Sequence, residues 1–301
     1  MSEGGGSTEE TATLTTETRT LVAHPNIIVH LIRSQAGTFA KALVESIMNS
    51  MDAGATKIEI ELDSSCYSVT DNGHGFRTRA EVLKVFEVFG FVHDDRHRDM
   101  GMFGLGRAQA FNWATNVWRT GTFRLDVDIR ARGLDYELES ELEPFPGLRI
   151  DGAFYEPMSE LDKHNLQLEL ERLCKYVAVP VLFNGKELQR DPAKVRWTHE
   201  DDDAYLKVSE RTTLAVYSQG VFVRDYPAHE MGVGGTLVTK HGKPLAVNMS
   251  RSDVLTHQCK LWAELRRRIK DIANKGVSGA SKKSRLTDTQ RDFLALESAD
   301  P

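Results

Sequence analysis

Three polar side chains recur along residues 43–55, LVESIMNSMDAGA, in a spacing that a helix places on one face. Glu45, Asn49 and Asp52 are separated by four and then three residues, so at 100° per residue they fall within roughly 60° of one another. A carboxylate in such a stripe can act as a general base, and an amide oxygen can ligate a hard cation. Alone, the pattern equally fits a helix whose polar residues simply face solvent. The neighbouring apolar stripe comprises Val44, Ile47, Met48 and Met51.

A second candidate motif, DNGHGF, spans residues 71–76 directly after a predicted strand. Asp71 stands at the end of that strand, where its carboxylate could accept a hydrogen bond from an exocyclic amine. Gly73 and Gly75 permit positive φ and a close approach of the backbone to a ligand. Taken alone, this motif is an ordinary Asp-Asn-Gly turn.

A third motif, GMFGLGRAQA, spans residues 101–110 and carries glycines at 101, 104 and 106 ahead of a predicted helix. Successive backbone N–H groups at the start of a helix can bind phosphate oxygens. By itself, a glycine-rich segment of this kind more often forms a flexible connection.

The elements that must position these motifs follow a mixed order. We predict a helix over 38–51, strands over 56–62 and 66–70, and a helix over 79–89. Because strands and helices do not alternate regularly, the fold class is α+β, a layered sandwich rather than a doubly wound sheet. Later elements are strands at 123–129, 135–139, 214–218, 221–225 and 235–239, helices at 160–176 and 262–272, and a hairpin turn at Asn184-Gly185.

In this order and spacing, the three motifs resemble the N, G1 and G2 boxes of the GHKL ATPases, the Bergerat-fold superfamily of MutL, DNA gyrase B, heat-shock chaperones, MORC proteins and histidine kinases. The stretch 49–62 looks most like MutL, and 101–106 looks like the chaperone and MORC version. Residues 179–188, VPVLFNGKEL, are similar to the end of the nucleotide domain. Residues 243–255, KPLAVNMSRSDVL, are similar to the arginine-bearing loop of the chaperone middle domain.

The resemblance implies ATP and Mg²⁺ as cofactors and assigns a role to each matching residue. Glu45 matches the general base for the attacking water, and Asn49 matches the Mg²⁺ ligand. Asp71 matches the aspartate that reads the adenine amino group, and Asp52 matches a pocket residue beside the base. The glycines that let the backbone pass close to the base match Gly73 and Gly75.

The resemblance also implies a lid and an arginine supplied from the second domain. Arg251 matches the arginine that reaches the γ-phosphate and stabilises transition-state charge. Arg107, beside the last lid glycine, is a further candidate for phosphate contact. The lid that closes over the phosphates matches Gly101, Gly104, Leu105 and Gly106.

Two departures from the family pattern stand out. The family carries a Gly-Thr pair on a late strand whose hydroxyl supports the adenine-reading aspartate, and the expected equivalent here is Gly152-Ala153. Loss of that hydrogen bond would cost on the order of 1 kcal/mol. The lysine that senses the γ-phosphate in MutL and gyrase has no clean match; Lys240 and Lys243 are candidates, although each also fits an ordinary solvated lysine.

The expected organisation is a disordered segment over 1–20, a GHKL nucleotide-binding domain over 21–190, a smaller α+β transducer- or middle-like domain over 191–275 and a flexible basic tail over 276–301. The implied function is Mg²⁺-dependent ATP binding with slow hydrolysis that drives a conformational and dimerisation switch. The implied assembly is a homodimer through the nucleotide domain, with DNA or a protein as client. The alternative is a nucleotide-gated protein- or DNA-binding module with little hydrolysis.

The amino-acid composition limits these functional interpretations. The 301 residues carry a formal net charge of −6, so bulk electrostatics do not favour nucleic acid or anionic membrane. The basic segment 266–285, with eight Lys or Arg against one Asp, could track a phosphate backbone or form a solvated helix end. The three cysteines form no CxxC pair, which favours a reducing, cytoplasmic setting. No signal peptide or membrane helix is expected.

Overall fold

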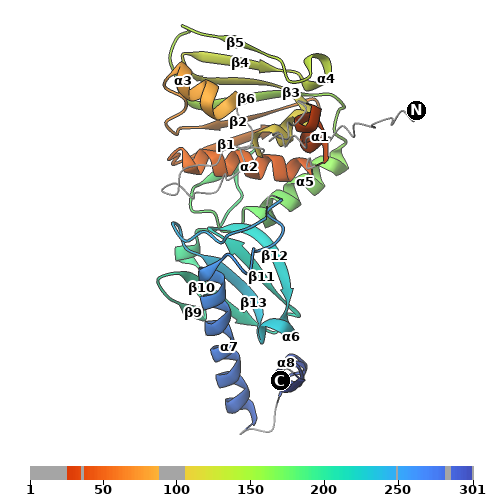
Figure 1. Cartoon of the computed structure of the whole chain (residues 1–301), viewed down its shortest axis with the longest axis vertical. Helices are drawn as coiled ribbons and strands as arrows, with labels where there is room; N and C mark the ends of the chain where they lie inside the picture. Colours follow the sequence, from red (N-terminus) through yellow and green to blue (C-terminus); the bar gives the residue numbers. More distant parts are fainter. Residues whose placement is uncertain (1–25, 35–36, 88–105, 249, 282–285, 300–301) are drawn as a thin grey trace, which may run out of the picture.

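The computed structural model places two β-sheets, each with its own hydrophobic core, along one elongated molecule (Figure 1). The α+β class predicted from the sequence is confirmed. The predicted disordered segment 1–20 lies outside the residues that the structure describes. Those residues are 26–34, 37–87, 106–248, 250–281 and 286–299.

The first sheet has eight strands in the order β5-β4-β3-β6-β2-β1-β7-β8. All neighbouring pairs are antiparallel except β1 and β7, which are parallel. The strands that the sequence predicts at 56–62 and 66–70 are present within one or two residues. The strands are β1 (Ile58–Leu62), β2 (Cys66–Asp71), β3 (Ala114–Gly121), β4 (Phe123–Val127), β5 (Tyr136–Glu139), β6 (Phe145–Phe154), β7 (Val181–Phe183) and β8 (Lys186–Glu187).

Helices cover one face of this sheet. Along β1 to β4 every second residue is buried, so the strands present one apolar face to the helices. Helix α2 (Phe39–Asp52) lies under that face beside α5 (Glu160–Leu173), with α1 (Asn26–Ser34) near their ends (Figure 1). The Thr38 hydroxyl caps α2 and also donates to Glu169 Oε1 over 2.8 Å, which ties the start of α2 to α5.

Three short helical segments differ from the sequence-based expectation. The helix predicted over 79–89 begins as α3 (Arg79–Val82) and continues as π-helix over Leu83–Glu87, and its predicted end is not among the described residues. The helix expected after the glycine-rich segment is a 3₁₀ helix over Gly106–Asn112. The strand predicted to reach residue 129 ends at Val127 because the Asp128 side chain caps α4 (Ile129–Arg132).

The second sheet has five strands in the order β12-β11-β13-β10-β9. Its core packs against α7 and centres on fully buried Trp262, Leu214 and Leu237. None of the helices in the described part of the chain combines the length and apolar composition needed to cross a bilayer. The elements are a 3₁₀ turn (Pro192–Lys194), β9 (His199–Glu200), β10 (Ala204–Ser209), β11 (Thr213–Ser218), β12 (Val221–Pro227), α6 (Ala228–Met231), β13 (Gly234–Thr239), α7 (Lys260–Ser281) and α8 (Asp288–Ala299).

The expectation of a flexible basic tail from residue 276 is wrong. Helix α7 runs on to Ser281, and α8 follows over Asp288–Ala299. Phe293 of α8 is 2% exposed and packs into the second core, close to Gly232. The composition of this region is polar overall, so the sequence did not indicate that one large apolar side chain anchors the last helix. Within the basic segment 266–285, part of the positive charge is neutralised, because Arg268 pairs with Asp201 and Asp203.

Candidate functional site

The polar stripe predicted on residues 43–55 lies on α2 and runs from the protein interior to solvent. Glu45 is 8% exposed, Asn49 is half-buried and Asp52 is exposed. A helix whose polar residues merely face solvent would not bury a carboxylate, since a buried charge is costly unless it is paired. The stripe therefore needs a partner for Glu45 from elsewhere in the chain.

Asp71 is the second buried carboxylate, 5% exposed at the end of β2. Its Oδ2 accepts a hydrogen bond from Ser50 Oγ over 2.7 Å, and its Oδ1 accepts from the Gly73 N–H over 2.8 Å. Because Ser50 belongs to α2, this contact joins the first two sequence motifs. Sequence reasoning missed Ser50; the available signal was a hydroxyl in an otherwise apolar, buried part of the helix.

The turn after Asp71 packs tightly against the end of α2. The His74 N–H donates to Ala53 O over 2.9 Å, and a Cβ on Gly73 would come within 2.8 Å of that same carbonyl oxygen. Gly75 has φ of +57°, and a Cβ there would lie 2.4 Å from Thr120 Oγ1. Glycine is thus required at both positions by contacts within the protein.

The partner of Glu45 is Arg251, which the structure brings from the second sheet's unit. Arg251 Nε donates to Glu45 Oε1 over 2.7 Å, and the two side chains are 19% and 11% exposed. Arg251 has φ of +50°, a conformation that L-residues with long side chains rarely adopt. Such backbone strain is typical of functional positions that the surrounding structure holds in place.

The loop that carries Arg251 is held at both ends. The Asn248 side chain accepts from the Ser252 N–H over 2.8 Å, and the Arg251 N–H donates to the Asn248 carbonyl over 2.9 Å. Asp253 accepts from Arg224 over 2.6 Å, which ties the loop to β12. Asn248 and Asp253 are positioning residues that the motif 243–255 contains but that sequence reasoning did not single out.

The lid residues predicted from the sequence can be placed only in part. Gly101, Gly104 and Leu105 are not among the described residues. Gly106 and Arg107 open the 3₁₀ helix Gly106–Asn112. Their assigned contacts with phosphate stay predictions.

The prediction that Gly152-Ala153 is the equivalent of the family's Gly-Thr pair beside Asp71 is wrong. In the register of β2 and β6, Gly152 and Ala153 face Tyr67 and Cys66, at the far end of the strand from Asp71. The residue opposite Asp71 is Leu148. The hydroxyl that supports Asp71 comes from Ser50 on the helix, so no bond is lost through Ala153.

The two candidate phosphate-sensing lysines make ion pairs within the second unit. Lys240 Nζ lies 2.9 Å from Glu200 Oε1, and Lys243 Nζ lies 2.8 Å from Asp203 Oδ1. Each lysine therefore has an ordinary surface role, which was the alternative to phosphate contact in the sequence analysis.

The groups that could hold a metal are few. Among the described residues, no three His, Cys, Asp or Glu side chains gather closely enough to form a metal site. The Asn49 side chain makes no hydrogen bond within this part of the chain, so its amide oxygen is available to a hard cation. A cation with one protein ligand of this kind would draw its other ligands from phosphate oxygens and water.

Comparison with known sequences points to a class of ATPase domains. Residues 37–164 match the family of histidine kinase-, DNA gyrase B- and HSP90-like ATPases. The match supports the GHKL superfamily for this part of the chain, as the three motifs predict. The match contains Glu45, Asn49 and Asp71, whereas Arg251 lies beyond it.

The chain is also similar to the chaperone protein HtpG from two strains of Porphyromonas gingivalis. Identity is 29% over 168 residues, which cover 50% of this chain and 24% of each relative. The aligned region thus spans about a quarter of the length of these curated relatives, so the likeness concerns one part of the chaperone.

Proposed function

We propose that this chain binds ATP with Mg²⁺ beside α2, hydrolyses it slowly, and uses the nucleotide to control contact between its two sheet units. The observation that carries the proposal is the ion pair between Arg251 and Glu45. It joins the residue matched to the catalytic base with the residue matched to the γ-phosphate arginine, from opposite units.

Nucleotide recognition is assigned to the buried Asp71. Ser50 and the Gly73 N–H each use one acceptor site of this carboxylate, which keeps further lone pairs for the adenine amino group. The Ser50 contact also fixes the rotamer of Asp71, so the carboxylate is preorganised before the base arrives. Asn49, one turn along from Glu45, would hold Mg²⁺, which neutralises phosphate charge when bound.

Hydrolysis is assigned to Glu45, which would accept the proton of the attacking water. In the present structure Arg251 occupies one carboxylate oxygen of Glu45. A triphosphate competes for the same guanidinium because its charge exceeds that of one carboxylate. Transfer of Arg251 to phosphate would free Glu45 and link nucleotide binding to the position of the 243–255 loop, which is the proposed switch.

The experiment compares wild type with Glu45→Gln and with Glu230→Gln, a matched control at an exposed position on α6. We expect wild type and Glu230→Gln to release phosphate from ATP·Mg²⁺, and Glu45→Gln to lose release while keeping nucleotide affinity. If Glu45→Gln releases phosphate as wild type does, the role of Glu45 as general base is refuted. Nucleotide binding by wild type without phosphate release would instead favour a nucleotide-gated binding module.

We further propose that ATP promotes a homodimer through the nucleotide domain, as is common in this superfamily. Light scattering with and without a non-hydrolysable ATP analogue tests this, and a mass that stays monomeric in both conditions contradicts it. A cytoplasmic setting is proposed from the cysteines: Cys66 is exposed and unpaired, and Cys174 and Cys259 are free and buried.

A further inference from the structure

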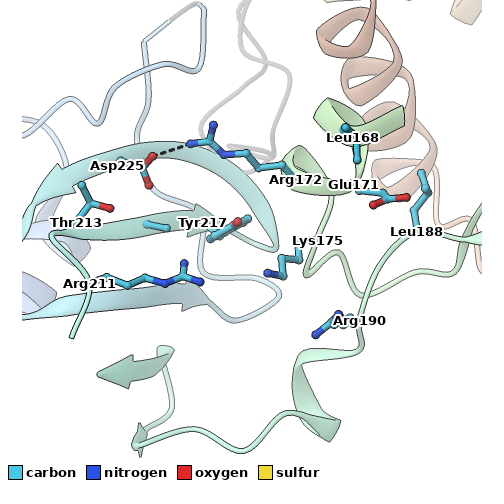
Figure 2. Close-up of a pocket in the computed structure, with 11 residues that line it drawn as sticks. Leu168, Glu171, Arg172, Lys175, Leu188, Arg190, Arg211, Thr213, Tyr217 and Asp225 are labelled. Carbon is cyan, nitrogen blue, oxygen red and sulfur yellow. Dashed lines mark hydrogen bonds and ion pairs between the residues drawn. The ribbon is translucent and has the colours of Figure 1, made fainter. Parts of the chain in front are cut away.

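A cavity of about 500 Å³ lies where the two sheet units meet (Figure 2). One wall comes from the C-terminal end of α5 and the segment around 188–190, and the other comes from β11 with the residues just before it and from β12. This junction cavity is separate from the residues of the proposed nucleotide site, none of which lines it. Its volume is in the range of small-molecule sites.

Both carboxylates that line the junction cavity already have partners. Asp225 Oδ2 lies 2.6 Å from the guanidinium of Arg172, an ion pair that spans the two units. Glu171 accepts a hydrogen bond from Gln167 over 2.9 Å. These contacts leave the remaining cations of the cavity without an anionic neighbour from its own lining.

Three of those cations come from three different segments: Lys175, Arg190 and Arg211. Within the described part of the chain, none of the three lies within 4 Å of a carboxylate oxygen. Figure 2 shows the ends of their side chains directed into the same space. Like charges repel, so their convergence is unfavourable unless something negative is present.

The electrostatic field at Lys175 is consistent with this geometry. Its pKa is lowered, first by burial and then by the positive charges of Arg190, Arg211 and Lys207. The same two arginines act on Tyr176 beside it. The site is therefore positive in a chain whose formal net charge is −6.

We propose that the junction cavity binds a small anion that carries two or more phosphate groups. The planar guanidinium groups of Arg190 and Arg211 can each grip a phosphate with paired N–H donors, and Lys175 adds a third positive charge. A cavity of this size takes a small molecule rather than a nucleic-acid strand. Because Lys175 and Arg190 belong to one unit and Arg211 to the other, the anion bridges the two units.

Isothermal titration with inorganic pyrophosphate, at fixed ionic strength and without nucleotide, tests the proposal on the full chain. Wild type is expected to bind one pyrophosphate, and inorganic phosphate at least tenfold more weakly. The double variant Arg190→Gln/Arg211→Gln is expected to lose at least tenfold in affinity. Lys186→Gln/Arg267→Gln removes two exposed charges elsewhere and serves as the matched control.

Three outcomes overturn the proposal. Wild type shows no saturable binding, the double variant binds as wild type does, or the control loses affinity to the same extent. A further arm uses Arg251→Gln: loss of binding there, with retention in the double variant, assigns the anion to the nucleotide site instead. Thermal melting of each variant, and the single change Lys175→Gln, separate loss of the site from loss of the fold.

Discussion

Arg251 and Glu45 are separated by 206 residues, and their side chains meet at 2.7 Å. Each explains a feature of the other. The Glu45 carboxylate is buried and needs a positive partner, and the strained backbone of Arg251 aims its guanidinium across the junction. Removal of one partner from a largely buried ion pair destabilises a protein far more than loss of a surface charge does, because the other charge stays buried without a partner. The contact therefore couples the two units at the proposed catalytic base.

The first prediction concerns Arg251→Gln. If Arg251 moves to the γ-phosphate during turnover, its removal lowers phosphate release by about tenfold or more, because an arginine that stabilises transition-state charge has effects of at least this size. Nucleotide affinity should change much less. Arg291→Gln, at an exposed position on α8, is the control. Equal phosphate release by Arg251→Gln and wild type would show that the contact is structural only.

The second prediction concerns the hydroxyl that supports Asp71. Ser50→Ala removes a donor to a buried carboxylate, a bond of roughly 1.5–3 kcal/mol, so ATP affinity should fall by about tenfold or more. Ser46→Ala is the matched control, because the Ser46 hydroxyl donates to Ala42 O within the same helix. Fluorescence titration with a labelled ATP analogue measures both. Equal affinities of the two variants would contradict the role given to Ser50.

The third prediction separates backbone strain from steric overlap at two glycines. Gly54 and Gly75 both have positive φ, but a Cβ on Gly54 has nothing within 4 Å, whereas a Cβ on Gly75 would lie 2.5 Å from Gly147 O. Gly54→Ala should cost about 1–2 kcal/mol of unfolding free energy. Gly75→Ala should cost clearly more, because backbone must move as well. Urea denaturation gives both values, and equal costs would contradict the contacts described.

The fourth prediction is a pH dependence in the second unit. Hydrogen bonds from Lys243 and Arg268 lower the pKa of Asp203. A carboxyl whose pKa is lower in the folded state stabilises the fold above its unfolded pKa of about 4, and this stabilisation is lost as pH falls through the folded value. Asp203→Asn should therefore destabilise the protein at pH 7 and lose its effect in strong acid.

Urea unfolding of Asp203→Asn at neutral and at acid pH checks this sign. Asp202→Asn is the control, because Asp202 is exposed and makes no ion pair with any described residue. A destabilisation by Asp203→Asn that is as large in strong acid as at pH 7 would show that the side chain acts through packing rather than charge.

Much of the first unit could be predicted from local patterns. The alternation of apolar residues in 56–62 and the spacing in 43–55 are short-range signals, and a sheet and a helix with buried faces follow from them. The spacings of the motifs around Glu45, Asp71 and Gly73 are short-range signals too, so these site residues could also be predicted. The local pattern failed to predict α8, because the single buried side chain of Phe293 anchors this helix after a polar segment.

The sequence by itself determined the class of the fold, the family, and which acidic and glycine residues stand at the candidate site, because these depend on spacing along one helix and one turn. Only the tertiary structure decided that Ser50 supports Asp71, that Arg251 meets Glu45, and that Lys175, Arg190 and Arg211 converge. Those pairings depend on strand register and on how two units meet. Both are set by the burial of apolar surface from many residues that are distant in the sequence, so no local spacing predicts them.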